Sequence, residues 1–353
     1  MNKFAVISGF LGSGKTSLMM ALTRTCGTLY GKAAMISNDL GAGVTLCDHK
    51  LAQLGGCRAE QITDECICFC RDQLSERLAA LFAEGCELVV SDIPGFGVGA
   101  QEHVYHGLTA EYPGRFALAP FTVLVEPHKL ALLREGLAGD LGFILDAQLR
   151  EADLIVLSKC DLLGAAERES ALAWLAERYP RTERLAVSAL TGVGLEALCR
   201  ALRDGSASLR SPEIDYDADG LQNAMDSVSE YYLQYRALVC CDDFDGSAYL
   251  RELAETVRDG VRSDGWEIPH LKILAWGPEG DWGKADVLGV DRPIELPKRF
   301  ERPCTDLGVL LNASAACPDD ALNRLIGEAV RDVSERFRLE LTVFKKDHFG
   351  LGD

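Results

Sequence analysis

Basic residues are scarce in this sequence compared with acidic ones. The 353 residues contain 36 Lys and Arg against 54 Asp and Glu, which gives a formal net charge of -18 at pH 7. Binding to a nucleic-acid backbone depends on clustered Lys and Arg, and so does binding to an anionic membrane surface. The charge balance therefore argues against both nucleic acid and membrane as partners.

Long hydrophobic runs are lacking as well. The first ten residues hold only a short apolar run that soon reaches glycines and a lysine, unlike a signal peptide. No later stretch approaches the length of a membrane span. We therefore expect a cytoplasmic protein whose 13 cysteines are thiols or metal ligands and do not form a disulfide framework.

Short apolar runs separated by helical or loop sequence make up the first part of the chain. Such runs are typical of buried parallel strands in a doubly wound sheet. The predicted strands are residues 4–9, 33–37, 87–91, 121–125, 154–158 and 185–187. The pattern predicts an α/β domain over residues 1–204 with a doubly wound, mostly parallel sheet.

The pattern changes after a polar segment rich in Ser, Asp and Gly, residues 205–228, which indicates a linker. Beyond it the predicted order is βαββαβ, which favours a ferredoxin-like α+β domain over residues 229–353. The predicted elements are residues 232–240, 247–262, 270–276, 306–313, 319–337 and 339–344. Residues 277–304 are expected to form a long loop, which could be a lid, a partner surface or an inert insertion.

A glycine-rich segment between the first strand and a helical pattern matches GxxxxGK[ST], the sequence of a P-loop. Its backbone N–H groups and the helix N-terminus would surround a phosphate. Lys15 would reach the β- and γ-phosphates, and the Thr16 hydroxyl would bind Mg²⁺. The predicted nucleotide-binding residues of this loop are Gly12, Ser13, Gly14, Lys15, Thr16 and Ser17.

A second segment, Asp92-Ile-Pro-Gly95, follows the third predicted strand. Asp92 suits a ligand of the Mg²⁺ shell, and the Gly95 backbone N–H could sense the γ-phosphate and move when it leaves. A carboxylate at this position, together with the P-loop, predicts nucleotide hydrolysis. An obvious arginine finger is not identifiable, so we expect slow hydrolysis without a partner.

Two further segments concern the base. Asp161 could accept hydrogen bonds from the ring N–H and the amino group of guanine, and the stem of Lys159 would cover one face of the base. Ser158 stands where this motif usually has Asn, so it leaves open how strictly guanine is chosen. The loop Ser188-Ala189-Leu190 falls where backbone groups would contact the base. We therefore expect GTP and GDP as ligands.

These segments, in this order, resemble the CobW-like metal-homeostasis GTPases, relatives of the urease and hydrogenase nickel-insertion GTPases and of cobalamin-enzyme chaperone GTPases. The resemblance covers residues 1–200. Asn38-Asp39-Leu-Gly41 is similar to a family segment that usually has Glu where Asp39 stands, and Asp92-Ile-Pro-Gly95 stands where Glu-Thr-Thr-Gly is typical. The resemblance implies a catalytic set of Lys15, Thr16, Asp39 and Asp92.

Three closely spaced cysteines, Cys66, Cys68 and Cys70, lie where the family has Gly-Cys-x-Cys-Cys, with Phe69 in place of the second adjacent cysteine. In an extended segment all three would face one ion, and a helix predicted from residue 72 would favour thiolates. Three thiolates suit Zn²⁺, or Co²⁺ or Ni²⁺. Burial of three small hydrophobic side chains is the alternative. Cys47 or Cys57 could supply a fourth ligand.

The expected function is therefore a GTP-hydrolysing metallochaperone or metal-insertion factor, with a Cys-x-Cys-x-Cys metal site coupled to the nucleotide state. The alternative is a G-protein chaperone that loads, protects or reactivates a cobalamin- or corrinoid-dependent enzyme. The expected partner is a client metalloenzyme or corrinoid protein, and a homodimer is one option for its assembly.

Overall fold

The computed structural model describes residues 2–136, 139, 141–210, 212, 214–215, 219–240 and 242–352. The chain divides into two compact units. The first comprises Met1–Leu40 and Gly55–Leu221, and the second comprises Gly41–Leu54 and Gln222–Asp353. The domain boundaries drawn from the sequence stay a prediction, and this division differs from them in placing Gly41–Leu54 with the second unit.

A parallel sheet forms the centre of the first unit, so the predicted α/β fold is confirmed. Its strands are β1 (Lys3–Gly9), β2 (Ala33–Asn38), β3 (Ala59–Ile62), β4 (Leu88–Asp92), β5 (Ala117–Leu118), β6 (Thr122–Val125), β7 (Leu154–Leu157) and β8 (Glu183–Ala186). Among the described residues the strand order is β3-β2-β4-β1-β6-β7-β8, and β5 pairs with β1. All of these pairs are parallel.

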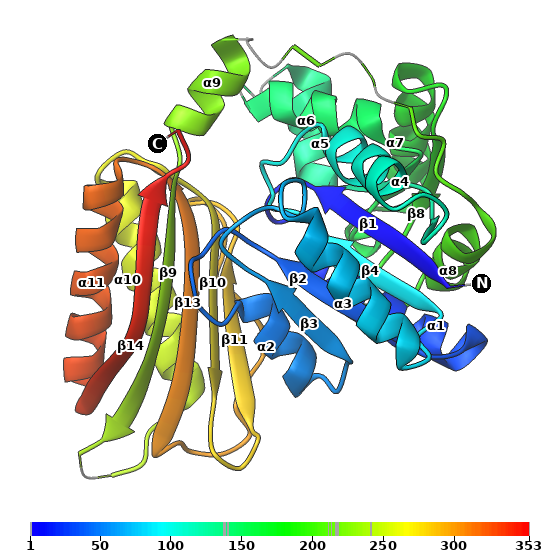
Figure 1. Ribbon diagram of the computed structural model, residues 1–353. Coiled ribbons are helices and arrows are strands. Elements are labelled where there is room, and N and C mark those ends of the chain that lie inside the picture. The colour runs from blue at the N-terminus through cyan, green and yellow to red at the C-terminus, as the bar shows by residue number, and fades with distance from the viewer. Residues whose placement is uncertain are drawn as a thin grey trace. The chain divides into compact units, whose positions relative to one another are not determined.

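Helices lie against the sheet of the first unit (Figure 1). They are α1 (Lys15–Tyr30), α3 (Arg71–Ala83), α4 (Gly107–Glu111), α5 (Pro127–Glu135), α6 (Leu141–Glu151), α7 (Ala165–Arg178) and α8 (Leu195–Asp204), with a π-helical turn at Gln101–His106 and a 3₁₀ turn at Cys160–Leu162. All seven residues of β1 are buried, although successive side chains point to opposite faces. Both faces of the sheet are therefore covered, which explains why its strands read as continuous apolar runs.

The sheet register brings two predicted site segments to one edge. In the pairing of β1 with β4, Ile7 lies opposite Asp92. Because the strands are parallel, the loop that follows Gly9 and the carboxylate that ends β4 both leave the sheet at its carboxyl edge, where ligands bind in open α/β sheets.

The second unit is built on an antiparallel sheet that helices cover, which confirms the predicted α+β domain. Its elements after α9 (Asp219–Asp226) are β9 (Ser229–Val239), α10 (Gly246–Ser263), β10 (Glu267–Trp276), β11 (Trp282–Val287), β12 (Glu295–Lys298), β13 (Asp306–Ala316), α11 (Asp319–Arg336) and β14 (Leu339–Gly350). In the described part of the chain the strand order is β12-β11-β10-β13-β9-β14. The four predicted strands have the ferredoxin-like order, and β11 and β12 lie inside the segment predicted as a long loop.

The segment inserted after β2 belongs to this second unit. Figure 1 shows α10 and α11 on one face of the antiparallel sheet and α2 (Cys47–Leu54) on the other. Asp48 of α2 forms an ion pair with Lys272, and the Lys50 ammonium lies 4.4 Å from the centre of the Trp276 ring. Alternate residues of a strand face the same side, so Lys272 and Trp276 of β10 share the face that α2 covers.

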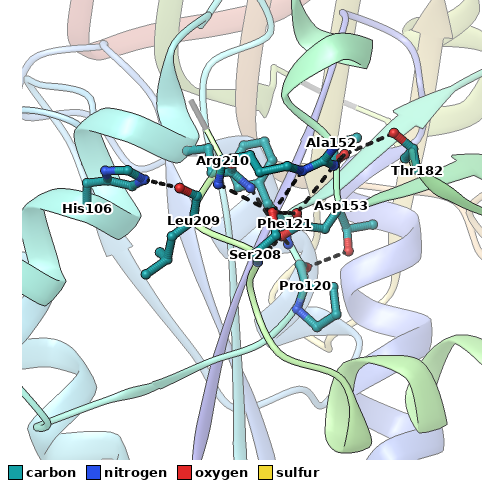
Figure 2. A network of polar contacts seen from close by, with 11 residues as sticks. His106, Pro120, Phe121, Ala152, Asp153, Thr182, Ser208, Leu209 and Arg210 are labelled. Atoms are coloured by element: carbon teal, nitrogen blue, oxygen red, sulfur yellow. Dashed lines mark hydrogen bonds and ion pairs between the residues drawn. The ribbon is translucent and has the colours of Figure 1, made fainter. Parts of the chain in front are cut away.

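Asp153 binds the segment of chain that follows α8, at Ser208 and Arg210 (Figure 2). The Asp153 carboxylate, which lies just before β7, accepts hydrogen bonds from the Phe121 N–H at 2.9 Å, from Gln101 Nε2 at 3.1 Å and from the Ser208 N–H at 3.2 Å. Arg210 lies 3.8 Å from the same carboxylate, whose side chain is 7% exposed. The first residues of the predicted linker are thus held at the amino-terminal edge of the sheet.

Replacing Asp153 by Ala should destabilise the protein by about 3 kcal/mol or more, because each buried donor left without a partner costs about 1–3 kcal/mol. The measurement is urea unfolding followed by circular dichroism. Asp204→Ala is the matched control, since that carboxylate is 54% exposed and pairs with its neighbour Arg203 at the surface. Equal unfolding midpoints for the two variants would show that the Asp153 network does not stabilise the fold.

Among the described residues, no helix combines the length and the apolar character that a membrane crossing requires.

Candidate functional site

The phosphate loop is shaped by glycines in the left-handed region. Gly9, Gly12 and Gly14 have φ values of +138°, +76° and +91°. A Cβ atom on Gly9 would lie 2.5 Å from the carbonyl oxygen of Leu124, so a side chain is excluded there. Lys15 Nζ donates to the Gly9 carbonyl at 2.6 Å. The loop therefore curls around the start of α1, with backbone N–H groups and one ammonium group gathered where an anion would bind.

The two predicted magnesium ligands present oxygen atoms at the carboxyl edge of the sheet. Thr16 lies in the first turn of α1 and is 8% exposed, and Asp92 ends β4 and is 3% exposed. The backbone N–H of Asn38 donates to Asp92 Oδ1 at 2.9 Å. Magnesium prefers a few oxygen ligands and keeps several waters, so a hydroxyl and a carboxylate fit it.

Two other predicted residues lie close by in sequence. Ser17 is exposed on α1. Asp39 follows β2, and its Oδ1 accepts a hydrogen bond from the Leu40 N–H at 2.9 Å. Their nucleotide-binding and catalytic roles stay predictions.

The turn after Asp92 lies between the phosphate loop and α6. A Cβ atom on Gly95 would lie 2.5 Å from Leu11 Cδ2 and 3.0 Å from the Leu11 backbone nitrogen. On the other side, Gln148 Nε2 donates to the Gly95 carbonyl at 3.0 Å and to the Gly97 carbonyl at 2.9 Å. Gln148 could not be predicted from the sequence, because a glutamine inside a helix matches no motif.

Glu151, one turn further along α6, holds the other end of the same loop. Its carboxylate accepts the Gly99 N–H at 2.6 Å and the Gln101 N–H at 3.1 Å. Burial raises the pKa of Glu151 to about 7, against the opposing effect of the backbone donors. Gln101 Nε2 also donates to Asp153, so this loop is joined to the carboxylate that binds the chain after α8.

The predicted base motif is joined to the phosphate loop. Ser158 Oγ donates to the Ser13 carbonyl at 2.7 Å. Lys159 adopts φ +50°, and its Cε would lie 3.8 Å from a Cβ atom built on Gly14. Asp161 is exposed in the 3₁₀ turn that follows. The residue that departs from the usual motif therefore has a structural partner in the loop.

The loop after β8 lies next to that turn. The Cys160 N–H donates to the Val187 carbonyl at 3.3 Å, and Ser188 Oγ accepts the Thr191 N–H at 3.0 Å. Ser188 is fully buried, whereas Leu190 is 86% exposed. The roles of Ser188, Ala189 and Leu190 in contacting the base stay predictions.

The three cysteines form a turn and not the extended segment expected. The Phe69 N–H donates to the Cys66 carbonyl at 2.8 Å. The sulfur atoms of Cys66 and Cys68 are 3.0 Å apart, whereas Cys70 Sγ lies 3.3 Å from the Cys66 carbonyl oxygen. Cys66 and Cys68 thus face each other and Cys70 faces the backbone, because a turn does not keep the alternation of a strand. Within the described ranges, no group of three or more His, Cys, Asp or Glu side chains is arranged to hold a metal ion.

The thiols differ in acidity. Hydrogen bonding with Cys68 holds the pKa of Cys66 below its ordinary value, and the same contact together with burial raises the pKa of Cys68. Burial raises the pKa of Cys70 to about 11, although this residue precedes α3.

Of the two candidates for a fourth ligand, Cys57 lies 3.5 Å from Thr23 Oγ1, and Cys47 begins α2 in the second unit.

Asn38 connects the Asp92 carboxylate to the cysteine turn. This residue ends β2 and is 3% exposed. Besides its backbone bond to Asp92, its Nδ2 donates to the carbonyls of Ile62 at 3.2 Å and Glu65 at 2.8 Å. Its Oδ1 accepts the Ile67 N–H at 2.9 Å. One buried side chain therefore fixes the entry to the turn and its second residue.

A protein-family comparison matches residues 3–186, more than half of the chain, to the model described as CobW/HypB/UreG, nucleotide-binding domain. A search of the curated proteins gave no match.

Several solved structures are similar to this chain. The hydrogenase maturation factor HypB from Archaeoglobus fulgidus is 21% identical, with 57% of this chain and 89% of that chain covered and a TM-score of 0.37. HypB from Helicobacter pylori in complex with nickel is 16% identical, with 59% and 90% covered and a TM-score of 0.41. The Zn(II)-bound YjiA GTPase from E. coli is 15% identical, with 93% and 99% covered and a TM-score of 0.36.

Proposed function

The chain belongs to the CobW/HypB/UreG family, and from this premise we propose that it is a GTP-hydrolysing metallochaperone or metal-insertion factor. The observation that carries the proposal is the set of hydrogen bonds through which Asn38 joins Asp92 to the cysteine turn. A carboxylate predicted to hold Mg²⁺ and the backbone of a cysteine turn, both bonded to one residue, suit a protein whose metal affinity follows its nucleotide.

The phosphate loop supports the hydrolytic part of the proposal. In GTP hydrolysis a water oxygen bonds to the γ-phosphorus, the bond from that phosphorus to the β–γ bridging oxygen breaks, and GDP and phosphate leave. Lys15 would neutralise the charge on the β- and γ-phosphates, and the backbone N–H groups of the loop would hold them in line. Thr16 and Asp92 would hold Mg²⁺, which when bound neutralises charge on the phosphate oxygens.

The cysteine turn supports the metal-binding part. Cys66 and Cys68 already place two sulfur atoms side by side, and the lowered pKa of Cys66 favours one thiolate. Cys70 would supply a third thiolate after its side chain turns away from the backbone. Zn²⁺, Co²⁺ and Ni²⁺ are the candidate cargo ions, and a client metalloenzyme would receive them.

A second candidate function follows from the present position of Cys70. Because this thiol does not face Cys66 and Cys68, the turn could instead serve as a structural or redox element. The protein would then be a G-protein chaperone that loads, protects or reactivates a corrinoid-dependent enzyme. The two functions differ in whether metal binding depends on the three thiols.

Zn²⁺ affinity should change by about 5- to 150-fold between the GDP state and a non-hydrolysable GTP analogue, the usual range of a coupling free energy of about 1–3 kcal/mol. Competition with a chromogenic chelator measures it in both states. Linkage requires the nucleotide affinity to change by the same factor when Zn²⁺ binds. This reciprocity can be checked by titrating a fluorescent nucleotide.

Changing Cys66, Cys68 and Cys70 together to Ser should abolish Zn²⁺ binding. The control is Cys240→Ser, which changes an exposed cysteine of the second unit and should leave the Zn²⁺ affinity intact. Equal Zn²⁺ affinities in the two nucleotide states would contradict the coupling and favour a static site. Zn²⁺ binding that survives the triple substitution would favour the chaperone alternative.

A further inference from the structure

One glutamine holds two carbonyl groups of the turn that follows Asp92. We propose that Gln148 is a positioning residue for nucleotide hydrolysis, which fixes the Gly95 peptide against the phosphate loop. The inference rests on the proposed GTP hydrolysis and concerns the rate of that reaction.

The contacts of Gln148 are specific to the turn. The residue is 2% exposed, so water does not compete for the hydrogen bonds. The two N–H groups of a single amide nitrogen reach carbonyls two residues apart, at 3.0 Å for Gly95 and 2.9 Å for Gly97. The Gly97 N–H also donates to the Pro94 carbonyl at 2.9 Å, which closes the turn. The amide therefore binds one backbone conformation of the turn and not an extended one.

The phosphate loop limits the turn from the opposite side. A Cβ atom on Gly95 would lie 2.5 Å from Leu11 Cδ2, so the Gly95 backbone already packs as closely as a glycine allows. Movement toward the loop is blocked by this contact, and movement away would break both bonds to Gln148. The Gly95 N–H is thus set in place relative to the loop that would carry the phosphates.

Glu151 provides the second attachment. Residues three apart on a helix lie on the same face, so Gln148 and Glu151 present one surface of α6 to the loop. Gln148 binds the carbonyls at the start of the loop, and Glu151 binds the N–H groups of Gly99 and Gln101 at its end. The two attachments therefore hold both ends of the loop between Gly95 and Gln101 on one helix.

The consequence concerns the rate more than nucleotide binding. Nucleotide affinity would come mainly from the P-loop and the base motif. Gln148 acts on the P-loop indirectly, by holding Gly95 against Leu11. A group that must face the γ-phosphate in the transition state loses its effect when its position varies, and a misplacement of about 1 Å can cost about 100-fold in rate. Loss of Gln148 should therefore lower kcat and leave KM almost unchanged.

The experiment compares Gln148→Met and Gln148→Glu with the parent protein. Both side chains are close to glutamine in size, but the first has no donor and an ionised glutamate would face two carbonyl oxygens. We expect kcat for GTP to fall by about 100-fold in both, with KM for GTP and the affinity for GDP within about threefold. Amide hydrogen exchange of the loop should become faster. Gln73→Met, an exposed position on α3, is the control.

The possible outcomes separate failure of this inference from failure of the proposed function. A kcat within threefold of the parent in both variants would overturn the inference while GTP hydrolysis by the parent still stood. A parent protein without GTP hydrolysis would overturn the proposed function itself. Variants that lose GDP binding together with activity would also overturn the inference, because Gln148 would then support the domain as a whole.

Discussion

Lys15→Ala should reduce GTP turnover by about 100- to 1,000-fold, the usual loss when one preorganised group that stabilises developing transition-state charge is removed. In the structure Lys15 Nζ lies 2.6 Å from the Gly9 carbonyl oxygen, inside the curve of the phosphate loop. Its ammonium is therefore held against the backbone of the loop that we propose binds the β- and γ-phosphates. Release of phosphate from GTP, measured with Mg²⁺ present, gives the turnover.

The control is Lys32→Ala, a lysine whose side chain is 48% exposed and pairs with Glu84 at the surface. Its turnover should equal that of the parent. GDP binding by Lys15→Ala should persist in weakened form, since the backbone N–H groups of the loop remain. Undiminished turnover in Lys15→Ala would mean that the phosphate site lies elsewhere, and the assignments of Thr16 and Asp92 would fail with it.

The parallel sheet was predictable because burial on both faces leaves a simple signature. β1, β4 and β7 are short apolar runs, and each was found within one or two residues of its observed bounds. β3 was missed for the opposite reason. It is Ala59-Glu-Gln-Ile62 and, among the residues that the structure describes, pairs only with β2 at the sheet edge. Two of its four side chains are therefore polar and partly exposed.

The attachment of Gly41–Leu54 to the second unit depends on contacts that sequence patterns do not encode. The ion pair of Asp48 with Lys272 joins residues 224 positions apart. Nothing near either residue indicates the other. The consequence for function is considerable, because this segment begins two residues after Asp39, so it links a predicted catalytic residue covalently to a helix that packs on the second sheet.

In the candidate site, too, some residues could be predicted from the sequence and others could not. Motifs with fixed spacing, such as the phosphate loop, predict residues whose chemistry depends on neighbours in the chain. The buried polar residues Asn38, Gln148 and Glu151 act through backbone groups, so their partners carry no side-chain signature. The prediction of an extended segment at the three cysteines was wrong. Alternation in a strand and hydrogen bonding in a turn place the same three side chains differently.

The base motif contains a departure that the structure explains in part. Ser158 Oγ donates to the Ser13 carbonyl, so this residue links the phosphate loop to the base motif. We accordingly expect Ser158→Ala to weaken GTP and xanthosine triphosphate binding to the same degree. It therefore serves as the control for the substitution that addresses the base itself.

Asp161→Asn should weaken GTP binding by about 10- to 150-fold, because a hydrogen bond to a charged group contributes about 1.5–3 kcal/mol. An ionised carboxylate accepts from both the ring N–H and the amino group of guanine, whereas the amide offers one acceptor and directs a donor at the amino group. Xanthine has a carbonyl oxygen where guanine has that amino group. The same substitution should therefore strengthen binding of xanthosine triphosphate.

The two changes have opposite signs, so the ratio of the two affinities is the sharpest measure. Displacement of a fluorescent GDP analogue by each triphosphate, and by ATP, gives all three affinities for the parent and both variants. Ser158→Ala should leave the ratio at its parent value while lowering both affinities, because it loosens the loop and not the base contact. Parent protein that binds ATP as well as GTP would refute the guanine assignment, since Asp161 has no matching donors to accept from on adenine. In that case the exposed Asp161 would be a solvated surface residue, and the hydrolysed nucleotide would have to be identified afresh.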